Sequence, residues 1–380
     1  VLDTVAPDAP ATPVVSATLN ADGIWIEGTA EAGSLVQVTR GRTVIGSLQL
    51  GTGQTAYSIP VPLEQDSVNA LDVTATDVAG NVSPATRVTV TEVPSLPTVF
   101  SVTSEGDANS GLYGRGTLRW AINQANASAG TDIINFNIPG AGIRTISPAT
   151  ALPALAGGIT IDGFSQPGAA PNTGKINEPF NGVLAVRIVG GNFNTLQITG
   201  DFNKVSGLSL AAGSSLANIL DVGGSSNILS GNILGLDSLG AVWGSSAVGA
   251  VRVYGSNNLI GGGAPADRNI IGNSQQGVYV SGGTGNRISG NFVGVGFTGS
   301  VSRANSTGVL VTGGAVQTVI GTNSDGIADG QEGNIVSGNS GMGIYVAGAS
   351  GTLVSGNIAG LSSAGNQAVA NGFWGIGLNN

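Results

Sequence analysis

Acidic side chains are the residues of this sequence that could catalyse a reaction on a sugar. The chain has no His and no Cys, which excludes a Ser-His-Asp triad, a histidine zinc site and thiolate chemistry. A pair of carboxylates that faces one sugar at about 5 to 9.5 Å is what glycoside hydrolysis would need instead. In the second half of the chain, the acids available for such a pair are Asp201, Asp221, Asp237, Asp267, Asp325, Asp329 and Glu332.

The spacing of these acids does not favour a catalytic pair. Asp221 stands between two apolar residues, so strand alternation turns it outward, and Asp237 follows in about the same coil of the repeat described below. The two could approach each other across a loop, but no neighbouring coil adds a third acid. A lyase-type site would need an acidic calcium cluster with an Arg base, yet Arg252 and Arg287 lie on different kinds of strand, and Arg252 has the outward position of a solvated charge. We therefore predict no catalytic residue, with a carbohydrate-active enzyme as the alternative.

Three tyrosines could form a platform for a sugar ring. Tyr279 and Tyr345 occupy equivalent outward positions two coils apart, and Tyr254 is the third candidate. The competing interpretation is that these residues are good strand formers, because aromatic side chains fit a pleated surface. Both interpretations stay open at this stage.

The densest acidic loop, residues 323–332, is a candidate calcium site. Asp325, Asp329 and Glu332 lie there among other oxygen-bearing residues and glycines, and carboxylate oxygens are the ligands that calcium prefers. The spacing departs from the Asp-x-Asp-x-Asp-Gly pattern and no helix-loop-helix context is present, so a solvated loop is the competing interpretation. Calcium is the one cofactor that the sequence suggests.

Composition restricts the partners. The formal charge of -9 disfavours nucleic acid and anionic lipid, which both attract basic surfaces. Charged residues make up only 9% and Gly reaches 64 of 380 residues, which is typical of stacked β-structure rather than disorder. No apolar run approaches the roughly 20 residues that span a bilayer.

A repeated sequence motif after residue 180 predicts a solenoid of parallel strands. Two apolar residues flank one variable position, a glycine turn follows, and a second short strand ends in Gly-Asn. Gly and Asn tolerate the left-handed backbone of a turn between sheets, and stacked Asn side chains could bond along the stack. The first strand of successive coils is expected to begin at Leu196, Leu220, Val251, Val278, Val309, Ile344 and Ile376.

The first 95 residues predict an antiparallel β-sandwich. Short segments of alternating apolar residues, separated by Gly, Pro and Asp, lie at 24–26, 35–38, 43–45, 70–75 and 86–90. The stretches 3–7, 28–33 and 76–81 resemble those of bacterial immunoglobulin-like repeats, which occur in tandem in large surface adhesins. The resemblance implies a spacer, with Asp3 and Asp77 as calcium ligands near an inter-domain junction. A turn closed by Asp77 is the alternative, and residues 92–97 are the expected linker.

Residues 116–126 predict a short amphipathic helix. Leu118, Ile122 and Ala125 have helical spacing and Thr117 is a candidate N-cap. Such a helix would cover the strand edges and apolar residues that the first coil of a solenoid exposes. This stretch, with 132–136 and 159–168, resembles a family of secreted bacterial proteins whose right-handed parallel β-helix opens with a Leu-Arg-x-Ala-Ile cap.

These expectations give an all-β chain of three parts. Residues 1–95 form the immunoglobulin-like sandwich, 96–180 the cap and first coils, and 181–380 the β-helix repeats. We expect a non-catalytic protein, secreted or on the bacterial cell surface, for adhesion, matrix formation or filament assembly; a carbohydrate-active enzyme or glycan-binding module is the alternative. A surface glycan or a host or matrix molecule is the expected partner. The sequence begins at Val1 and stops within a coil, so we expect a piece of a longer protein, or an end completed by head-to-tail self-association.

Overall fold

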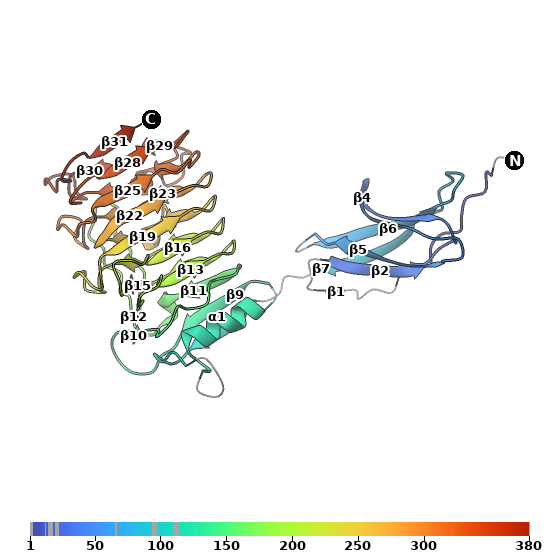
Figure 1. The fold of residues 1–380 in the computed structure, drawn as a ribbon, viewed down its shortest axis with the longest axis horizontal. Coiled ribbons are helices and arrows are strands. Elements are labelled where there is room, and N and C mark those ends of the chain that lie inside the picture. The colour runs from blue at the N-terminus through green and yellow to red at the C-terminus, as the bar shows by residue number, and fades with distance from the viewer. Residues whose placement is uncertain are drawn as a thin grey trace. The chain divides into compact units, whose positions relative to one another are not determined.

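The computed structural model describes residues 3–11, 13, 18–19, 23–64, 67–92, 97–108, 114–128 and 130–379. The chain divides into two compact units, Val1–Leu96 and Pro97–Asn380. Each unit has a hydrophobic core of its own. The strands and helices of both units are labelled in Figure 1.

The first unit is an immunoglobulin-like arrangement of two sheets. One sheet has five strands in the order β1-β7-β6-β3-β4, and the other pairs β2 with β5. Tyr57, Ile59 and Val61 of β5 point into the core, between outward-facing residues that include Pro60 and Pro62. β5 was not predicted, because two prolines weaken its strand pattern. It pairs with β2 alone, and proline is tolerated in such edge strands. The bounds are β1 (Thr18–Leu19), β2 (Gly23–Thr29), β3 (Leu35–Arg40), β4 (Thr43–Gln49), β5 (Ala56–Pro62), β6 (Val68–Thr76) and β7 (Thr86–Glu92).

The cap of the second unit consists of β8 (Thr98–Val102) and the helix α1 (Leu118–Ala127). Thr117 is the N-cap as predicted, since its hydroxyl accepts a hydrogen bond from the Trp120 N–H. The predicted apolar face of α1 is buried against the first coil, beside β9 (Figure 1). The Arg of the cap motif, Arg119, forms two bonds of 2.8 and 2.9 Å with the carboxylate of Asp107 and further bonds with the carbonyls of Thr150 and Ala151. This arginine therefore ties the helix to the coil beneath it.

Three parallel sheets form the β-helix, and each complete coil gives one strand to every sheet. The nine-stranded sheet contains β8, β9 (Asp132–Phe136), β11 (Ile159–Asp162), β14 (Lys204–Ser206), β17 (Ile228–Ser230), β20 (Leu259–Gly261), β23 (Arg287–Ser289), β26 (Val319–Gly321) and β29 (Leu353–Ser355). The eight-stranded sheet contains β10 (Arg144–Ile146), β12 (Val186–Val189), β15 (Leu208–Ala211), β18 (Ile233–Leu234), β21 (Ile270–Ile271), β24 (Phe292–Val293), β27 (Ile335–Val336) and β30 (Ile358–Ala359). The seven-stranded sheet contains β13 (Leu196–Ile198), β16 (Leu220–Val222), β19 (Ala247–Val253), β22 (Ser274–Val280), β25 (Thr307–Val311), β28 (Ile344–Ala347) and β31 (Ile376–Asn379). Short helices lie at η2 (Gly163–Ser165), η3 (Pro265–Asp267) and α2 (Asp329–Glu332).

The register of the seven-stranded sheet confirms the predicted repeat. Leu196 pairs with Leu220, and the ladder continues through Val251, Val278, Val309, Ile344 and Ile376. The second predicted strand of each coil belongs to the nine-stranded sheet. The third strand was missed, because many of its members, such as Ile233–Leu234, are only two residues long.

Asparagines at the corners of the coils form three ladders. The first links Asn203, Asn227, Asn258 and Asn286, with amide-to-amide distances of 3.0, 3.0 and 3.2 Å. The second runs through Asn232, Asn269, Asn291, Asn334 and Asn357, and the third through Asn305, Asn339 and Asn371. The expectation of bonding along the stack is confirmed.

The expected backbone role of asparagine in Gly-Asn needs correction. Three glycines that precede asparagines of the second ladder take the left-handed backbone, with φ of 68° at Gly231, 70° at Gly290 and 69° at Gly356. The asparagines that follow them have negative φ and use their side chains for the ladder. The glycine and the asparagine of the Gly-Asn motif thus have separate structural roles.

Candidate functional site

The outer face of the seven-stranded sheet carries four of the side chains selected on chemical grounds, Asp221, Arg252, Tyr279 and Tyr345. One column of outward positions, in register from coil to coil, consists of Gln197, Asp221, Arg252, Tyr279, Leu310, Tyr345 and Gly377. Neighbouring strands lie about 4.8 Å apart, so the two tyrosines of this column are roughly 10 Å apart. Their predicted placement on one face, two coils apart, is confirmed. We call this set the outer column.

Asp221 of the outer column is only 5% exposed, although its position faces outward. Its Oδ1 lies 3.9 Å from Arg252 Nη1 and accepts a hydrogen bond of 3.3 Å from Asn218 Nδ2. Burial raises the pKa of Asp221, and the charge of Arg252 and a hydrogen bond from the Tyr254 hydroxyl offset this rise only in part. Arg252 is therefore not the isolated solvated charge that the sequence suggested.

Tyr254 covers Asp221 because Gly223 leaves room for its ring. A Cβ on Gly223 would lie 2.5 Å from the Tyr254 ring. The guanidinium of Arg252 stacks at 5.4 Å from the centroid of the same ring. Tyr254 thus belongs to a polar cluster around a buried carboxylate. Its role could not be inferred from sequence, because Gly223 and Tyr254 belong to different coils.

Asp237 has a different partner. Its Oδ2 lies 3.5 Å from Arg187 Nη2, and its Oδ1 accepts hydrogen bonds from the N–H groups of Leu239 and Ala241. Arg187 belongs to β12 of the eight-stranded sheet, whereas Asp221 pairs with an arginine of the seven-stranded sheet. The two acids considered as a catalytic pair are therefore each bound to a separate arginine on a separate sheet.

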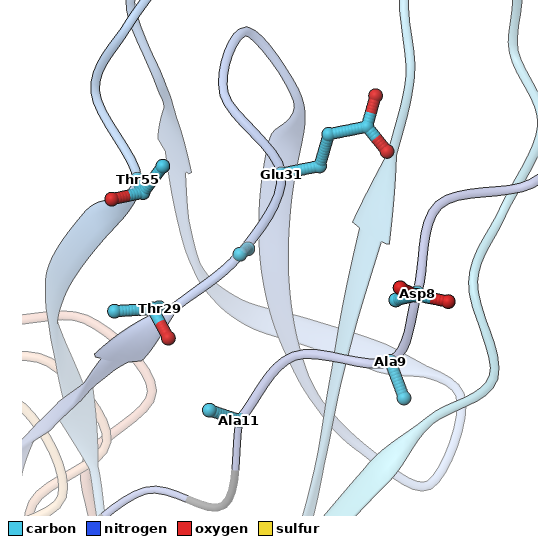
Figure 2. Close-up of a pocket in the computed structure, with 7 residues that line it drawn as sticks. Asp8, Ala9, Ala11, Thr29, Glu31 and Thr55 are labelled. Atoms are coloured by element: carbon cyan, nitrogen blue, oxygen red, sulfur yellow. The ribbon is translucent and has the colours of Figure 1, made fainter.

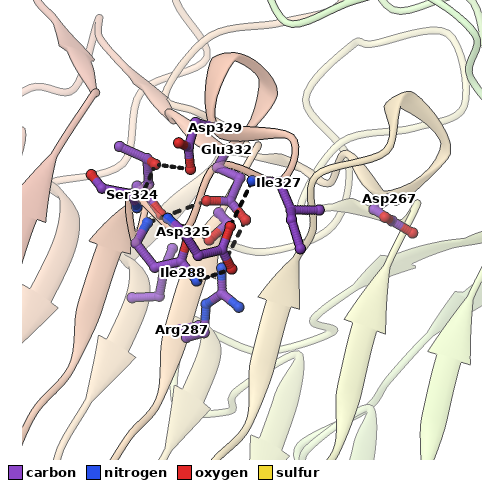
Figure 3. Close-up of polar contacts among 12 residues, drawn as sticks. Asp267, Arg287, Ile288, Ser324, Asp325, Ile327, Asp329 and Glu332 are labelled. Atoms are coloured by element: carbon purple, nitrogen blue, oxygen red, sulfur yellow. Dashed lines mark hydrogen bonds and ion pairs between the residues drawn. The ribbon is translucent and has the colours of Figure 1, made fainter.

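The acidic loop before β27 is held together by its own hydrogen bonds (Figure 3). Asp325 accepts bonds from Asn323 Nδ2 at 2.7 Å and from the Ile327 N–H at 2.8 Å, and the Asn323 bond is the main cause that lowers the pKa of Asp325. Asp329 accepts a bond from the Thr322 hydroxyl at 2.8 Å. These two carboxylates therefore already bind donors of the protein.

Glu332, the third candidate ligand of this loop, is 5% exposed and pairs with Arg287 at 2.8 Å (Figure 3). Its second oxygen accepts a bond from the Asn323 N–H at 3.2 Å. In the part of the chain that the structure describes, no three acidic side chains are grouped so that they could hold a metal ion. Calcium binding by this loop stays a prediction.

Asp3 and Asp77 of the first unit meet through Asn81. Asn81 Nδ2 donates to the carbonyl of Asp3 at 3.2 Å and to Asp77 Oδ2 at 2.9 Å. Asp77 Oδ1 accepts bonds from the N–H groups of Ala79 and Asn81, at 2.8 and 2.9 Å, so it closes a turn as the alternative interpretation had it. The Asn81 side chain is also the main cause that lowers the pKa of Asp77. A calcium ion at this place would have to displace these donors.

A hollow of about 550 Å³ in the first unit was not foreseen (Figure 2). It forms where the N-terminal segment joins β2, through a bond of 2.9 Å from the Ala11 N–H to the Thr29 carbonyl. Only the folded chain brings these segments together, so no local sequence pattern could reveal the hollow. Its lining consists of Asp8, Ala9, Ala11, Thr29, Ala30, Glu31 and Thr55.

Comparison with known proteins identifies the first unit. Residues 6–92 match the family described as bacterial Ig domain. The chain thus contains a bacterial Ig domain followed by a parallel β-helix. No curated protein sequence matches the chain. Within the described residues, no helix is both long enough and apolar enough to cross a membrane.

Two kinds of solved structure are similar to the chain at low scores. One is a family 28 exopolygalacturonase of Yersinia enterocolitica, with 10% identity, a TM-score of 0.22, and coverage of 99% of this chain and 87% of that chain. The other is the catalytic domain of a GH87 α-1,3-glucanase in complex with nigerose, with 12% identity, a TM-score of 0.16, and coverage of 95% of this chain and 88% of that chain. Scores this low carry no inference about activity.

Proposed function

We propose that this chain acts outside a bacterial cell as a non-catalytic surface protein. The Ig domain would serve as a spacer, and the β-helix would present a rigid outer face for adhesion or matrix formation. The match to bacterial Ig domains supports the extracellular setting. Resistance to mechanical or chemical disruption, rather than turnover, is what such a role requires.

The asparagine ladders are the observation that carries this proposal. The polar residue that recurs in coil after coil bonds to its counterpart above and below, and these amides are buried along most of each ladder. Buried amides in a fully bonded network stiffen a core and specify its register. The asparagines that recur in the sequence therefore have a structural role, and they make the solenoid a rigid support for its outer face.

Glycan binding on the outer column is the second candidate function. Trp374 and Tyr345 both approach Gly377, where a Cβ would lie 2.8 Å from the Trp374 ring and 3.2 Å from the Tyr345 ring. Trp374 is 58% exposed. Aromatic rings offer a large apolar face with a polar edge, which suits the flat faces of sugars. Tyr279, Tyr345 and Trp374 would together form such a platform.

The test is binding of the full chain to immobilised bacterial and host polysaccharides, with Tyr279→Ala/Tyr345→Ala as the variant. Trp25→Ala is the matched control, because Trp25 is an exposed aromatic residue on β2 of the other unit. Loss of binding in the double variant alone supports the outer column. Equal binding by wild type, double variant and control would contradict it.

Self-association and calcium binding are proposals that one experiment can test. The cap helix α1 covers the core at the first coil, so head-to-tail contact there would involve the edge of β8 rather than a stacked core. Light scattering at rising concentration, with calcium and then with a chelator, should show growth of polymers if filaments form. A constant monomer mass under all conditions would contradict filament assembly.

A further inference from the structure

The cap contains a second hollow, of about 520 Å³, which belongs to the β-helix unit. Small-molecule pockets commonly have volumes of about 300 to 1,000 Å³. The hollow is distinct from the outer column, because its residues come from β8 and the residue after it, from the turn before α1 and from the first turn of α1. It is lined by Val99, Ser101, Thr103, Arg115, Gly116 and Trp120. We call it the cap site.

The main chain shapes the cap site. β8 is the terminal strand of its sheet, and strand alternation places Val99, Ser101 and Thr103 on one side of it. The Thr103 N–H donates to the Gly116 carbonyl at 2.8 Å, which fixes the turn before α1 against the strand. Gly116 has φ of +82°, and a Cβ there would lie 2.4 Å from the Thr103 hydroxyl. Only glycine allows this approach.

The positive charge of the cap site comes from Arg115. It is exposed, and within the described part of the chain it takes part in no ion pair. Its guanidinium lies 6.0 Å from the centroid of the Trp120 ring, which Phe100 meets edge-on at 6.1 Å. A ring beneath a guanidinium holds the cation by cation–π attraction while the N–H donors stay available. By contrast, Arg119, on α1 itself, is bonded to Asp107.

We propose that the cap site binds a sugar that carries one carboxylate at the end of a glycan. The planar guanidinium of Arg115 matches a carboxylate with two parallel hydrogen bonds. The Ser101 and Thr103 hydroxyls can bond sugar hydroxyls, and Trp120 provides an amphipathic wall. A net charge of -9 would repel a polyanion but tolerates a single acidic group.

An extended peptide suits the cap site less well. Strand addition requires a free row of N–H and C=O groups along an edge, and the Thr103 N–H is already bonded to Gly116. The remaining free edge of β8 is short. The cap site does not rest on the proposed function, since no residue of the outer column takes part in it.

The experiment measures binding of the full chain to a glucuronic-acid-terminated disaccharide by calorimetry. Two comparison ligands show which chemical group is recognised. One is the same disaccharide with its carboxyl reduced to an alcohol, and the other is an acidic tripeptide. Arg115→Gln should weaken binding of the acidic disaccharide by about ten- to a hundredfold, as expected for loss of a charge-assisted hydrogen bond. Arg115→Lys should lose less, because it keeps the charge. Arg42→Gln, at an exposed arginine in the turn between β3 and β4, is the matched control and should have no effect.

Four results would contradict the proposal that the cap site binds an acidic sugar. They are no binding of the acidic disaccharide, equal binding of its reduced form, equal binding of the tripeptide, or equal loss in Arg115→Gln and Arg42→Gln. Thermal melting confirms that each variant is folded. The variant Tyr279→Ala/Tyr345→Ala should keep this binding, so failure of the outer column and failure of the cap site are separable.

Discussion

Asn258→Ala perturbs the first ladder at its centre. Asn258 is 1% exposed. Its Oδ1 accepts bonds from the N–H and the Nδ2 of Asn227, at 2.9 and 3.0 Å. Its Nδ2 donates to the carbonyl of Gly224 at 3.0 Å and to Asn286 Oδ1 at 3.2 Å. Alanine removes all four bonds and leaves their partners buried.

The expected loss of stability follows from the number of hydrogen bonds that alanine removes. A hydrogen bond contributes about 1 kcal/mol net, and a buried partner left without one costs about 1 to 3 kcal/mol. Loss of the four bonds should therefore lower the free energy of unfolding of the solenoid by roughly 4 kcal/mol. This amount exceeds the effect of an ordinary surface substitution, which is usually within about 0.5 kcal/mol.

Native-state hydrogen exchange, read by mass spectrometry on peptides that cover β17 and β20, measures the local free energy of opening. Asn192→Ala is the control, because Asn192 has an exposed side chain. A loss of less than about 1 kcal/mol at Asn258, no more than one ordinary hydrogen bond contributes, would refute the argument. So would a loss equal to that of the control.

Three further predictions concern single positions. Thr318→Asn should raise the melting temperature, because Thr318 is fully buried beside Asn286 in the register, its hydroxyl has no partner in the described structure, and an amide there would extend the ladder. Burial raises the folded-state pKa of Asp221 above that of the unfolded chain, so the contribution of its protonated form to stability is present below about pH 4 and is lost as pH rises through the raised pKa. The difference in melting temperature between wild type and Asp221→Asn, measured from pH 3 to 8, should show this decline. A difference that is independent of pH would contradict it. Gly223→Ala should displace the Tyr254 ring and so expose Asp221, which reduces the burial that is the largest cause of its raised pKa, whereas the lost Tyr254 hydrogen bond is the smallest cause. Titration of the carboxyl carbon by NMR should then show a lower pKa than in the wild type, and an unchanged value would argue against the contact.

The β-helix was predictable where its residues repeat. The inward pairs of the seven-stranded sheet recur once in each coil, so the ladder from Leu196 to Ile376 could be located. Three of the predicted strand starts were wrong, because β19, β22 and β25 begin two to four residues before the inward pair. Strands without such a pattern were missed. β5 is interrupted by prolines, and strands such as Ile233–Leu234 are too short to show a period.

The surroundings of the candidate side chains were less predictable than the strands. Alternation shows that Asp221 faces outward, but its burial depends on Tyr254 of the next coil and on the missing side chain of Gly223. The pairing of Glu332 with Arg287 joins residues 45 positions apart. Contacts of this kind arise from stacking and from loop paths, which no local pattern encodes.

The most direct test of the non-catalytic role is prolonged incubation of the full chain with the polysaccharides that it binds, followed by mass spectrometry of the soluble products. For a non-catalytic protein we expect bound polysaccharide of unchanged length, with no new reducing ends and no unsaturated sugars. Products that accumulate with time, and that disappear in Asp221→Asn, would contradict it and would identify the chain as a carbohydrate-active enzyme.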